Sequence, residues 1–187
     1  MKKLLLVAVM VLTSAMTFAQ QKEGTLTIQP KVGLNIASLT DFDDSDPRFG
    51  VVAGAEFMYQ ATDMVGLSFG ALYSMQGAKY DKTTTKLDYI NIPVLANVYV
   101  APGFAVKLGL QPGFNVNSKA KAKGNGGAVE ADIDAKTVDL SIPIGLSYEF
   151  NNFVIDGRYN WGLTKVAKHS DCKNSVFQIT LGYKLPL

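Results

Sequence analysis

The sequence has 187 residues, of which 48% are hydrophobic and 18% are charged, with one cysteine and one histidine. This length fits a single domain, and the lone Cys and His exclude a disulfide framework and any metal site built from several such residues. If Lys2 and Lys3 belong to an export signal, 18 − 2 = 16 basic residues remain against 16 acidic ones. A neutral chain offers no basic field to nucleic acid, so we expect no nucleic-acid partner.

The N-terminus has the three parts of a Sec signal peptide. Met1-Lys2-Lys3 is a basic start, residues 4–12 are apolar, and Thr17-Phe18-Ala19 places small residues where a signal peptidase cleaves. The apolar run is shorter than the ~20 residues that a membrane-spanning helix needs. We predict that residues 1–19 are a signal peptide and that the exported chain, residues 20–187, is one domain.

Apolar residues in the exported chain recur at every second position, which is the period of a β-strand with one apolar face. The last segment is the clearest, because Phe177, Ile179 and Leu181 alternate with Gln178 and Thr180. Gly, β-branched and aromatic residues dominate throughout, and they disfavour helix. We predict eight strands, at about residues 25–39, 49–60, 64–78, 87–100, 104–117, 137–150, 153–165 and 175–187.

Three features indicate that the apolar faces point outward to lipid and not inward, as they would in a soluble lipocalin-like barrel. The apolar residues are too many for the lumen of eight strands, which holds packed side chains or one small ligand. Glycines gather on the polar face, where they weaken a water-facing strand but make room inside a narrow barrel. Predicted links alternate between short turns (61–63, 101–103, 151–152) and long loops (40–48, 79–86, 118–136, 166–174).

Short turns on one side and long loops on the other are typical of outer-membrane barrels, in which the short side is periplasmic. We therefore predict an all-β fold, an eight-stranded antiparallel up-and-down transmembrane β-barrel in the cell outer membrane. An even number of strands places both termini in the periplasm.

The polar faces carry equal numbers of basic and acidic residues. Buried charges need oppositely charged partners to offset the cost of desolvation. We predict a structural ion-pair network in the lumen, formed by Lys31, Glu56, Lys107, Asp139, Glu149, Asp156, Arg158 and Lys184. A lumen filled in this way leaves no general diffusion pore.

Several prolines lie inside predicted strands, and a proline removes one hydrogen bond from the ladder of a closed barrel. Pro93 and Pro143 fall on polar faces, and we expect a bulge at each. Pro30 and Pro112 raise the same problem on the apolar faces.

The loop at residues 118–136 has two interpretations. Its basic and acidic arms flank a Gly-rich tip, so it can form a hairpin that pairs Lys121 with Glu130 and Lys119 with Asp132. That register conflicts with the lipid faces below it unless an irregularity intervenes. The alternative is a flexible, solvated loop, and the sequence does not decide between the two.

His169, Ser170 and Asp171 are catalytic residue types, but neighbours in sequence cannot converge as a triad. Some eight-stranded barrels act on lipid A acyl chains with a Ser and a His at the outer rim, and His169 could serve as the base in such a site. We favour an exposed loop histidine without a role. Cys172 lies in the same predicted loop.

Asp41, Asp43, Asp44 and Asp46 resemble a run of Ca²⁺ ligands but lack the Gly and the distal Glu of an EF-hand loop. We interpret them as a solvated acidic loop. The sequence therefore predicts no catalytic, cofactor-binding or metal-binding residues, and we expect no enzymatic activity.

Short motifs along nearly the whole exported chain resemble the outer-membrane β-barrel family of Bacteroidota, called PorT-like or "porin family". They are VGLNIA (32–37), LDYINIPVL (87–95), IPIGLSYEF (142–150), RYNWGLT (158–164) and ITLGYKL (179–185). The resemblance implies a small barrel similar to OmpA and OmpX, and most members have no assigned activity. The chain departs from the usual assembly signal by ending in Leu187 and not in an aromatic residue, and we expect Tyr183 to take that role.

These observations predict a monomeric structural or surface-interaction protein that acts through long extracellular loops. Its expected partners are outer-membrane lipid and lipopolysaccharide, the barrel-assembly machinery during insertion, and other envelope proteins. The first alternative is a component of an envelope or protein-secretion assembly, as implied by the PorT-like resemblance. A lipid A-modifying enzyme and a soluble lipocalin-like carrier are the remaining alternatives.

Overall fold

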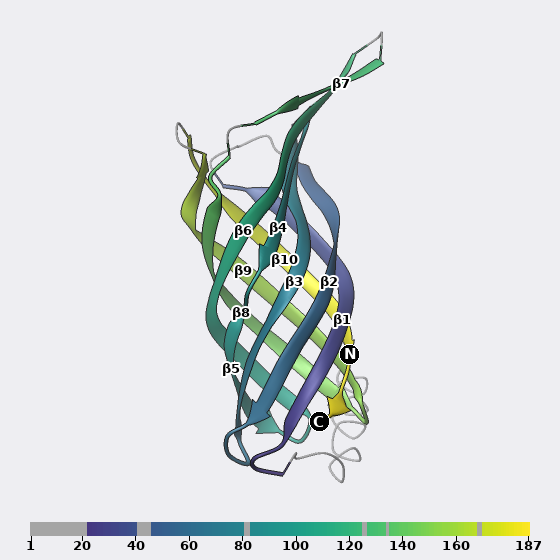
Figure 1. Ribbon diagram of the computed structural model, residues 1–187, viewed down its shortest axis with the longest axis vertical. Helices are drawn as coiled ribbons and strands as arrows, with labels where there is room; N and C mark the ends of the chain where they lie inside the picture. The colour runs from purple at the N-terminus through teal and green to yellow at the C-terminus, as the bar shows by residue number, and fades with distance from the viewer. Residues whose placement is uncertain (1–21, 41–45, 81–82, 125–126, 134, 168–169) are drawn as a thin grey trace, which may run out of the picture.

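The structure is a computed structural model and describes residues 22–40, 46–80, 83–124, 127–133, 135–167 and 170–187 (Figure 1). All of its regular elements are strands, and they form one sheet. The strands are β1 (Leu26–Leu39), β2 (Asp46–Gln60), β3 (Val65–Tyr80), β4 (Thr83–Asn91), β5 (Val94–Ala101), β6 (Phe104–Gly124), β7 (Gly127–Asp132), β8 (Val138–Phe150), β9 (Phe153–Ala167), β10 (Ser170–Tyr183) and β11 (Leu185–Pro186).

The sheet closes into a barrel of eight antiparallel wall strands, which confirms the predicted fold class. The first and last wall strands, β1 and β10, pair from Lys31 opposite Gly182 to Leu39 opposite Asn174. Strands β4 and β5 together form the fourth wall strand, and both pair with β3 and β6. Closure leaves no unpaired edge in the wall, as a sheet surrounded by lipid requires.

The wall strands extend further than predicted at one end of the barrel, which we call the hairpin end because β7 lies there (Figure 1). Strands β2 and β4 begin earlier than predicted, at Asp46 and Thr83. Strand β9 continues to Ala167, and β10 begins already at Ser170. The long loops predicted at 40–48, 79–86 and 166–174 are therefore wrong in their bounds. Past the apolar belt the outer face of a strand can be polar, so the apolar alternation that marks a strand fades although the ladder continues.

Of the two interpretations of the loop at residues 118–136, the structure has the hairpin. Strand β7 pairs with β6, with Lys121 opposite Glu130, Lys119 opposite Asp132 and Gly124 opposite Gly127. The register then shifts by one residue between β7 and β8, because the amide of Asn115 donates to the carbonyl of Thr137 in the register of the barrel wall. This shift is the irregularity that the hairpin needs.

The bulges expected at Pro93 and Pro143 are wrong, because the pairing register is the same on both sides of each proline. Residues that face each other in an antiparallel ladder exchange two hydrogen bonds, and a proline removes one of them. The other bond remains: Gly70 N–H donates to Pro93 O (3.2 Å), and Ile92 N–H donates to Pro112 O (2.8 Å). One bond per pair is enough to hold the register.

Side chains alternate between a buried polar interior and an exposed apolar exterior. In β10, Gln178 is fully buried, whereas its neighbour Ile179 is 47% exposed. The exposed apolar residues encircle the wall and form what we call the apolar belt. Its members include Val32, Leu34, Val51, Leu67, Phe69, Ile90, Val94, Leu108, Phe114, Ile144, Leu146, Ile155 and Leu181.

Some of the sequence-based predictions lie outside the described residues, namely the signal peptide at 1–19, His169, and the acidic residues Asp41, Asp43 and Asp44. Within the described part of the chain, no helix is long and apolar enough to span a bilayer.

The apolar belt predicts a position-dependent cost for an added charge. Ile179→Arg places a guanidinium on the belt and should lower the free energy of unfolding by about 2–4 kcal/mol if the position is near mid-bilayer. Val129→Arg is the matched control, because Val129 is 70% exposed on β7, beyond the barrel wall. This change should cost less than about 0.5 kcal/mol. Urea titrations in lipid vesicles measure both values, and equal losses would contradict the assignment of the belt.

Candidate functional site

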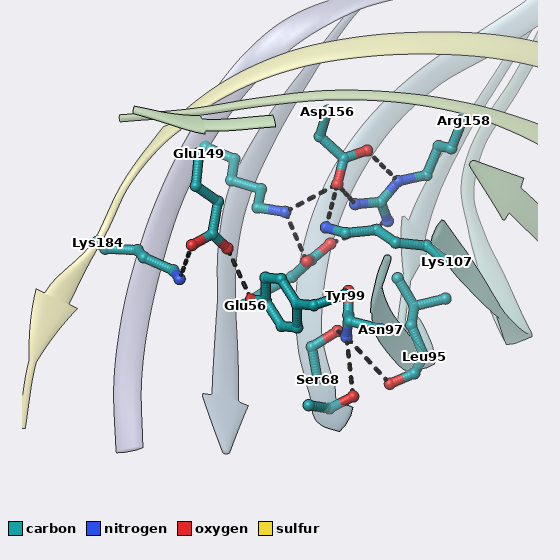
Figure 2. A network of polar contacts seen from close by, with 12 residues as sticks. Glu56, Ser68, Leu95, Asn97, Tyr99, Lys107, Glu149, Asp156, Arg158 and Lys184 are labelled. Atoms are coloured by element: carbon teal, nitrogen blue, oxygen red, sulfur yellow. Dashed lines mark hydrogen bonds and ion pairs between the residues drawn. The ribbon is translucent and has the colours of Figure 1, made fainter. Parts of the chain in front are cut away.

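The interior of the barrel holds a cluster of five charged side chains from four strands, four of which Figure 2 labels. Lys31 of β1 lies 2.6 Å from Glu56 of β2 and 3.4 Å from Asp156 of β9. Arg158 donates from Nε and Nη2 to both carboxylate oxygens of Asp156, at 2.9 and 2.8 Å. Lys107 of β6 also donates to Asp156. Each carboxylate therefore meets at least two cations.

Arg158 also connects the two acids, because its Nη1 lies 2.9 Å from Oε1 of Glu56. All five side chains are nearly inaccessible to solvent. The cluster thus ties together opposite walls of the barrel by charge, and it fills the lumen at this depth.

A second cluster involves the predicted residues Glu149 and Lys184, which form an ion pair. The hydroxyl of Tyr99 donates to the other carboxylate oxygen of Glu149 at 2.8 Å (Figure 2). The structure places the remaining predicted residue, Asp139, apart from both clusters. Asp139 accepts hydrogen bonds from Thr164 (2.6 Å) and Asn174 (3.1 Å).

Glycines provide the space for these long side chains. Glu56 faces Gly70 in the ladder, and Gly145 faces Arg158 on one side and Lys107 on the other. A Cβ at Gly70 would lie 2.8 Å from Cγ of Glu56, and a Cβ at Gly145 would lie 2.7 Å from Cβ of Arg158. An added Cβ would also lie 2.3 Å from the carbonyl oxygen of Ala55 at Gly70 and 2.6 Å from that of Gly157 at Gly145, so both positions exclude a side chain beside the charged residues.

Sequence reasoning missed a further charged pair at the hairpin end. Arg48 lies 3.6 Å from Asp88, and Asp88 also accepts hydrogen bonds from Tyr73 (3.2 Å) and Asn117 (2.8 Å). Arg48 lies in a predicted loop, and Asp88 has the parity of the apolar face. A charged residue at an apolar parity was the available signal of the irregularity in the pairing of β4 with β6.

An apolar cluster closes the lumen at the hairpin end. Its members are buried and come from the ends of β1, β3, β4, β9 and β10. They are Leu39, Ala78, Leu87, Tyr89, Val166 and Cys172. Cys172, predicted in a loop, belongs instead to β10 and is buried in this cluster.

Beyond the barrel wall, a sheet projects from the hairpin end (Figure 1). This projecting sheet consists of residues 79–80 of β3, 83–86 of β4, 119–124 of β6 and β7. Glu130 lies 3.0 Å from Lys86 and 3.4 Å from Lys121. The hydrogen bond from Lys86 lowers the pKa of the Glu130 carboxyl.

Among the described residues, no three His, Cys, Asp or Glu side chains converge to hold a metal ion. The structure therefore presents two features that can carry a function: the charged lumen and the projecting sheet.

Comparisons with known proteins identify the family and the architecture. A family model described as "Outer membrane protein beta-barrel domain" matches residues 18–168. No curated protein matches the chain significantly. Neisserial surface protein A (NspA) is 19% identical, with a TM-score of 0.57 over 87% of this chain and 100% of NspA. Ail, the attachment invasion locus protein of Yersinia pestis, is 17% identical, with a TM-score of 0.53 over 88% of this chain and 100% of Ail. A second structure of Ail contains the heparin analogue sucrose octasulfate, with the same TM-score of 0.53.

The lumen cluster predicts a large effect from loss of its central cation. Arg158→Met leaves Asp156 and Glu56 buried with fewer partners and should destabilise the barrel by about 3–5 kcal/mol. Lys121→Met removes a cation from the partly exposed pair with Glu130 and should change stability little. Urea midpoints of the refolded variants test this difference. A tolerated Arg158→Met would mean that the cluster does not hold the walls together.

Proposed function

The chain belongs to the outer membrane protein β-barrel domain family, and we propose that it acts at the cell surface through the projecting sheet and not by transport through its lumen. The observation that carries this proposal is the sheet itself, whose strands β6 and β7 continue well past the barrel wall (Figure 1). In this proposal the hairpin end is extracellular and the end with the short turns is periplasmic.

The interior supports this proposal because it leaves little room for a solute. The ion-pair cluster around Arg158 spans the lumen, and the apolar cluster around Tyr89 lies above it. An eight-stranded barrel is narrow enough for side chains to fill it. Opening a path would require separating buried ion pairs, which is costly.

The projecting sheet has features of a recognition surface. Among the described strands, β7 pairs with β6 alone, so the other edge of β7 has backbone groups available for a partner strand. Val129 on this strand is 70% exposed. Ail is described as an attachment invasion locus protein, but at 17% identity the likeness concerns the fold, so the proposal rests on this chain's own sheet.

The finer expectations from the sequence belong to the same proposal. We propose that the chain is a PorT-like member of the family and that residues 1–19 are a signal peptide. We also propose that the barrel is monomeric and that the barrel-assembly machinery inserts it. A structural role without enzymatic activity is proposed as well. The alternative of an envelope or secretion assembly component differs in its prediction, because such a component needs fixed protein partners.

The filled lumen predicts that the barrel does not conduct ions as a porin does. The purified full chain, inserted into planar bilayers, should give no stable channel openings of porin size, because the buried cluster blocks the path. Arg158→Met, which weakens that cluster, should give more frequent brief openings. Porin-like conductance from the unchanged chain would contradict the surface role, because the lumen would then transport solutes.

The surface role predicts that the hairpin can be removed without loss of the barrel. In the test variant, residues 119–132 are replaced by an Asn-Gly turn, which joins β6 to β8 close to the rim. Intact cells that carry this variant should aggregate and adhere to glass less than cells with the full chain. The variant should retain the heat-dependent gel migration of a folded barrel.

Unchanged aggregation and adherence in cells with the folded variant would contradict the surface role. A fixed partner that co-purifies with both the full chain and the variant would instead support the envelope assembly alternative, because the partner would then bind elsewhere than the hairpin.

A further inference from the structure

One acidic side chain in the lumen has no basic partner. Asp139 of β8 is 7% exposed, and no ion pair in the described part of the chain includes it. Its two donors are neutral, because the Thr164 hydroxyl (2.6 Å) and the Asn174 amide (3.1 Å) donate to its carboxylate. Each of the other acids predicted for the lumen forms an ion pair. Asp139 therefore needs a compensating positive charge if its carboxylate is ionised.

The ion-pair cluster lies too far along the lumen to supply that charge. In the ladder, Asp139 faces Gly113 of β6, and the cluster member on this strand is Lys107, 113 − 107 = 6 residues away. On β9, Thr164 is 164 − 158 = 6 residues from Arg158. Six residues of a strand span about 20 Å, which is beyond the reach of a lysine or arginine side chain. The cluster has three cations and two acids, but its surplus charge makes no ion pair with Asp139.

Two buried oxygen atoms near Asp139 lack hydrogen-bond donors. Nδ2 of Asn174 donates to Asp139 and to the Tyr89 hydroxyl (3.3 Å), while Oδ1 of the same amide has no partner. Oε1 of Gln111 is also without a partner, and Gln111 faces Ser141, two residues along β8 from Asp139. Asn174 and Gln111 are each 2% exposed. We call Gln111, Asp139 and Asn174 the acceptor layer, because each contributes a buried oxygen acceptor.

A glycine lies beside the acceptor layer. Gly113 separates Asn91 of β4 from Asp139 in the ladders, since it faces both residues. A Cβ at Gly113 would lie 2.6 Å from Oδ1 of Asn91, so the Asn91 amide extends over this glycine toward Asp139. Tyr89, two residues closer to the hairpin end on β4, belongs to the apolar cluster. The acceptor layer therefore lies between the apolar cluster on one side and the ion-pair cluster, further along the lumen, on the other.

We propose that the acceptor layer binds one monovalent alkali cation, Na⁺ or K⁺, between the carboxylate of Asp139 and the amide oxygens of Asn174 and Gln111. Oxygen atoms are the ligands that hard cations prefer, and amide carbonyl oxygens can replace the hydration shell of an alkali ion. A single carboxylate balances a single positive charge, whereas a divalent ion would leave an excess charge buried in the lumen. A proton on Asp139 could serve only one of the unpartnered oxygens, whereas a cation coordinates several at once.

The bound cation is a structural part of the lumen and not a transported ion, because closed layers of side chains lie on both sides of it. Since the ligands converge only in the closed barrel, the cation binds the folded chain and stabilises it according to its concentration. The site lies in the interior and is independent of the surface role of the projecting sheet.

The test measures how the stability of the full chain, refolded in lipid vesicles, depends on Na⁺. Urea titrations at constant ionic strength replace Na⁺ with tetramethylammonium, whose methyl groups keep oxygen ligands away from its charge. Above the dissociation constant, each tenfold rise in Na⁺ should raise the ratio of folded to unfolded chain about tenfold. A parallel series with K⁺ identifies the preferred alkali ion, and a response to neither ion would overturn the proposal.

Variants connect this response to the acceptor layer. D139N removes the carboxylate charge and should abolish the dependence on Na⁺ or K⁺, whereas D132N removes the same charge on exposed β7 and should retain it. Gln111→Met keeps a similar volume but loses one amide oxygen, so it should shift the response to higher cation concentrations. Heat-dependent gel migration checks that each variant is folded. An unchanged response in D139N, or in Gln111→Met if D139N does not fold, would place the ion elsewhere and contradict the proposed site.

Infrared spectroscopy reports the charge of Asp139 without unfolding the barrel. In the absence of an alkali ion, the buried carboxylate should take up a proton, because burial disfavours an unpaired charge. The unchanged chain refolded in tetramethylammonium chloride should therefore show a protonated carboxyl band that is absent in NaCl or KCl and absent from D139N in every salt. The same protonated band in all salts would overturn the proposal, since a proton would then take the place of the cation.

Discussion

The structure depends on closure of one antiparallel sheet. Backbone N–H and C=O groups surrounded by lipid have no water to bond, so every wall strand needs a partner on both sides. The pairing of β1 with β10, from Lys31 to Leu39 on one side and from Gly182 to Asn174 on the other, completes this requirement. The prolines within the wall are tolerated because each removes one bond and leaves its ladder in register, as the bond from Gly70 to Pro93 illustrates.

Closure with eight strands makes the lumen narrow, and the narrow lumen determines what can fill it. Charged side chains from facing walls come within ion-pair distance, and glycines such as Gly145 occupy the positions beside them. Neither feature is stable alone, because an unpaired buried charge is costly and an isolated glycine weakens a strand. The interior is thus a structural device, and the surfaces available for recognition are those outside it.

The transition from wall to projecting sheet depends on a single extra residue. Val116 shifts the parity of β6, so that lysines at odd positions face outward where Lys107, also odd, faces inward. The same ladder therefore continues from lipid into water with its polar residues on the outer side. The bulge, a local feature of one strand, changes which side chains of β6 face outward.

The sequence by itself determined the number of wall strands and the side of each strand that faces outward, and it offered the hairpin as one of two interpretations of the loop at residues 118–136. These features follow from a period of two residues and from the charges on two adjacent arms, which are local properties of the chain. Only the tertiary structure decided which charges meet, because Lys31 and Asp156 are 125 positions apart and touch across the closed lumen. It also separated Asp139 from the ion pairs and revealed the pair of Arg48 and Asp88. No local pattern encodes these contacts, because they depend on the stagger of strands around the barrel.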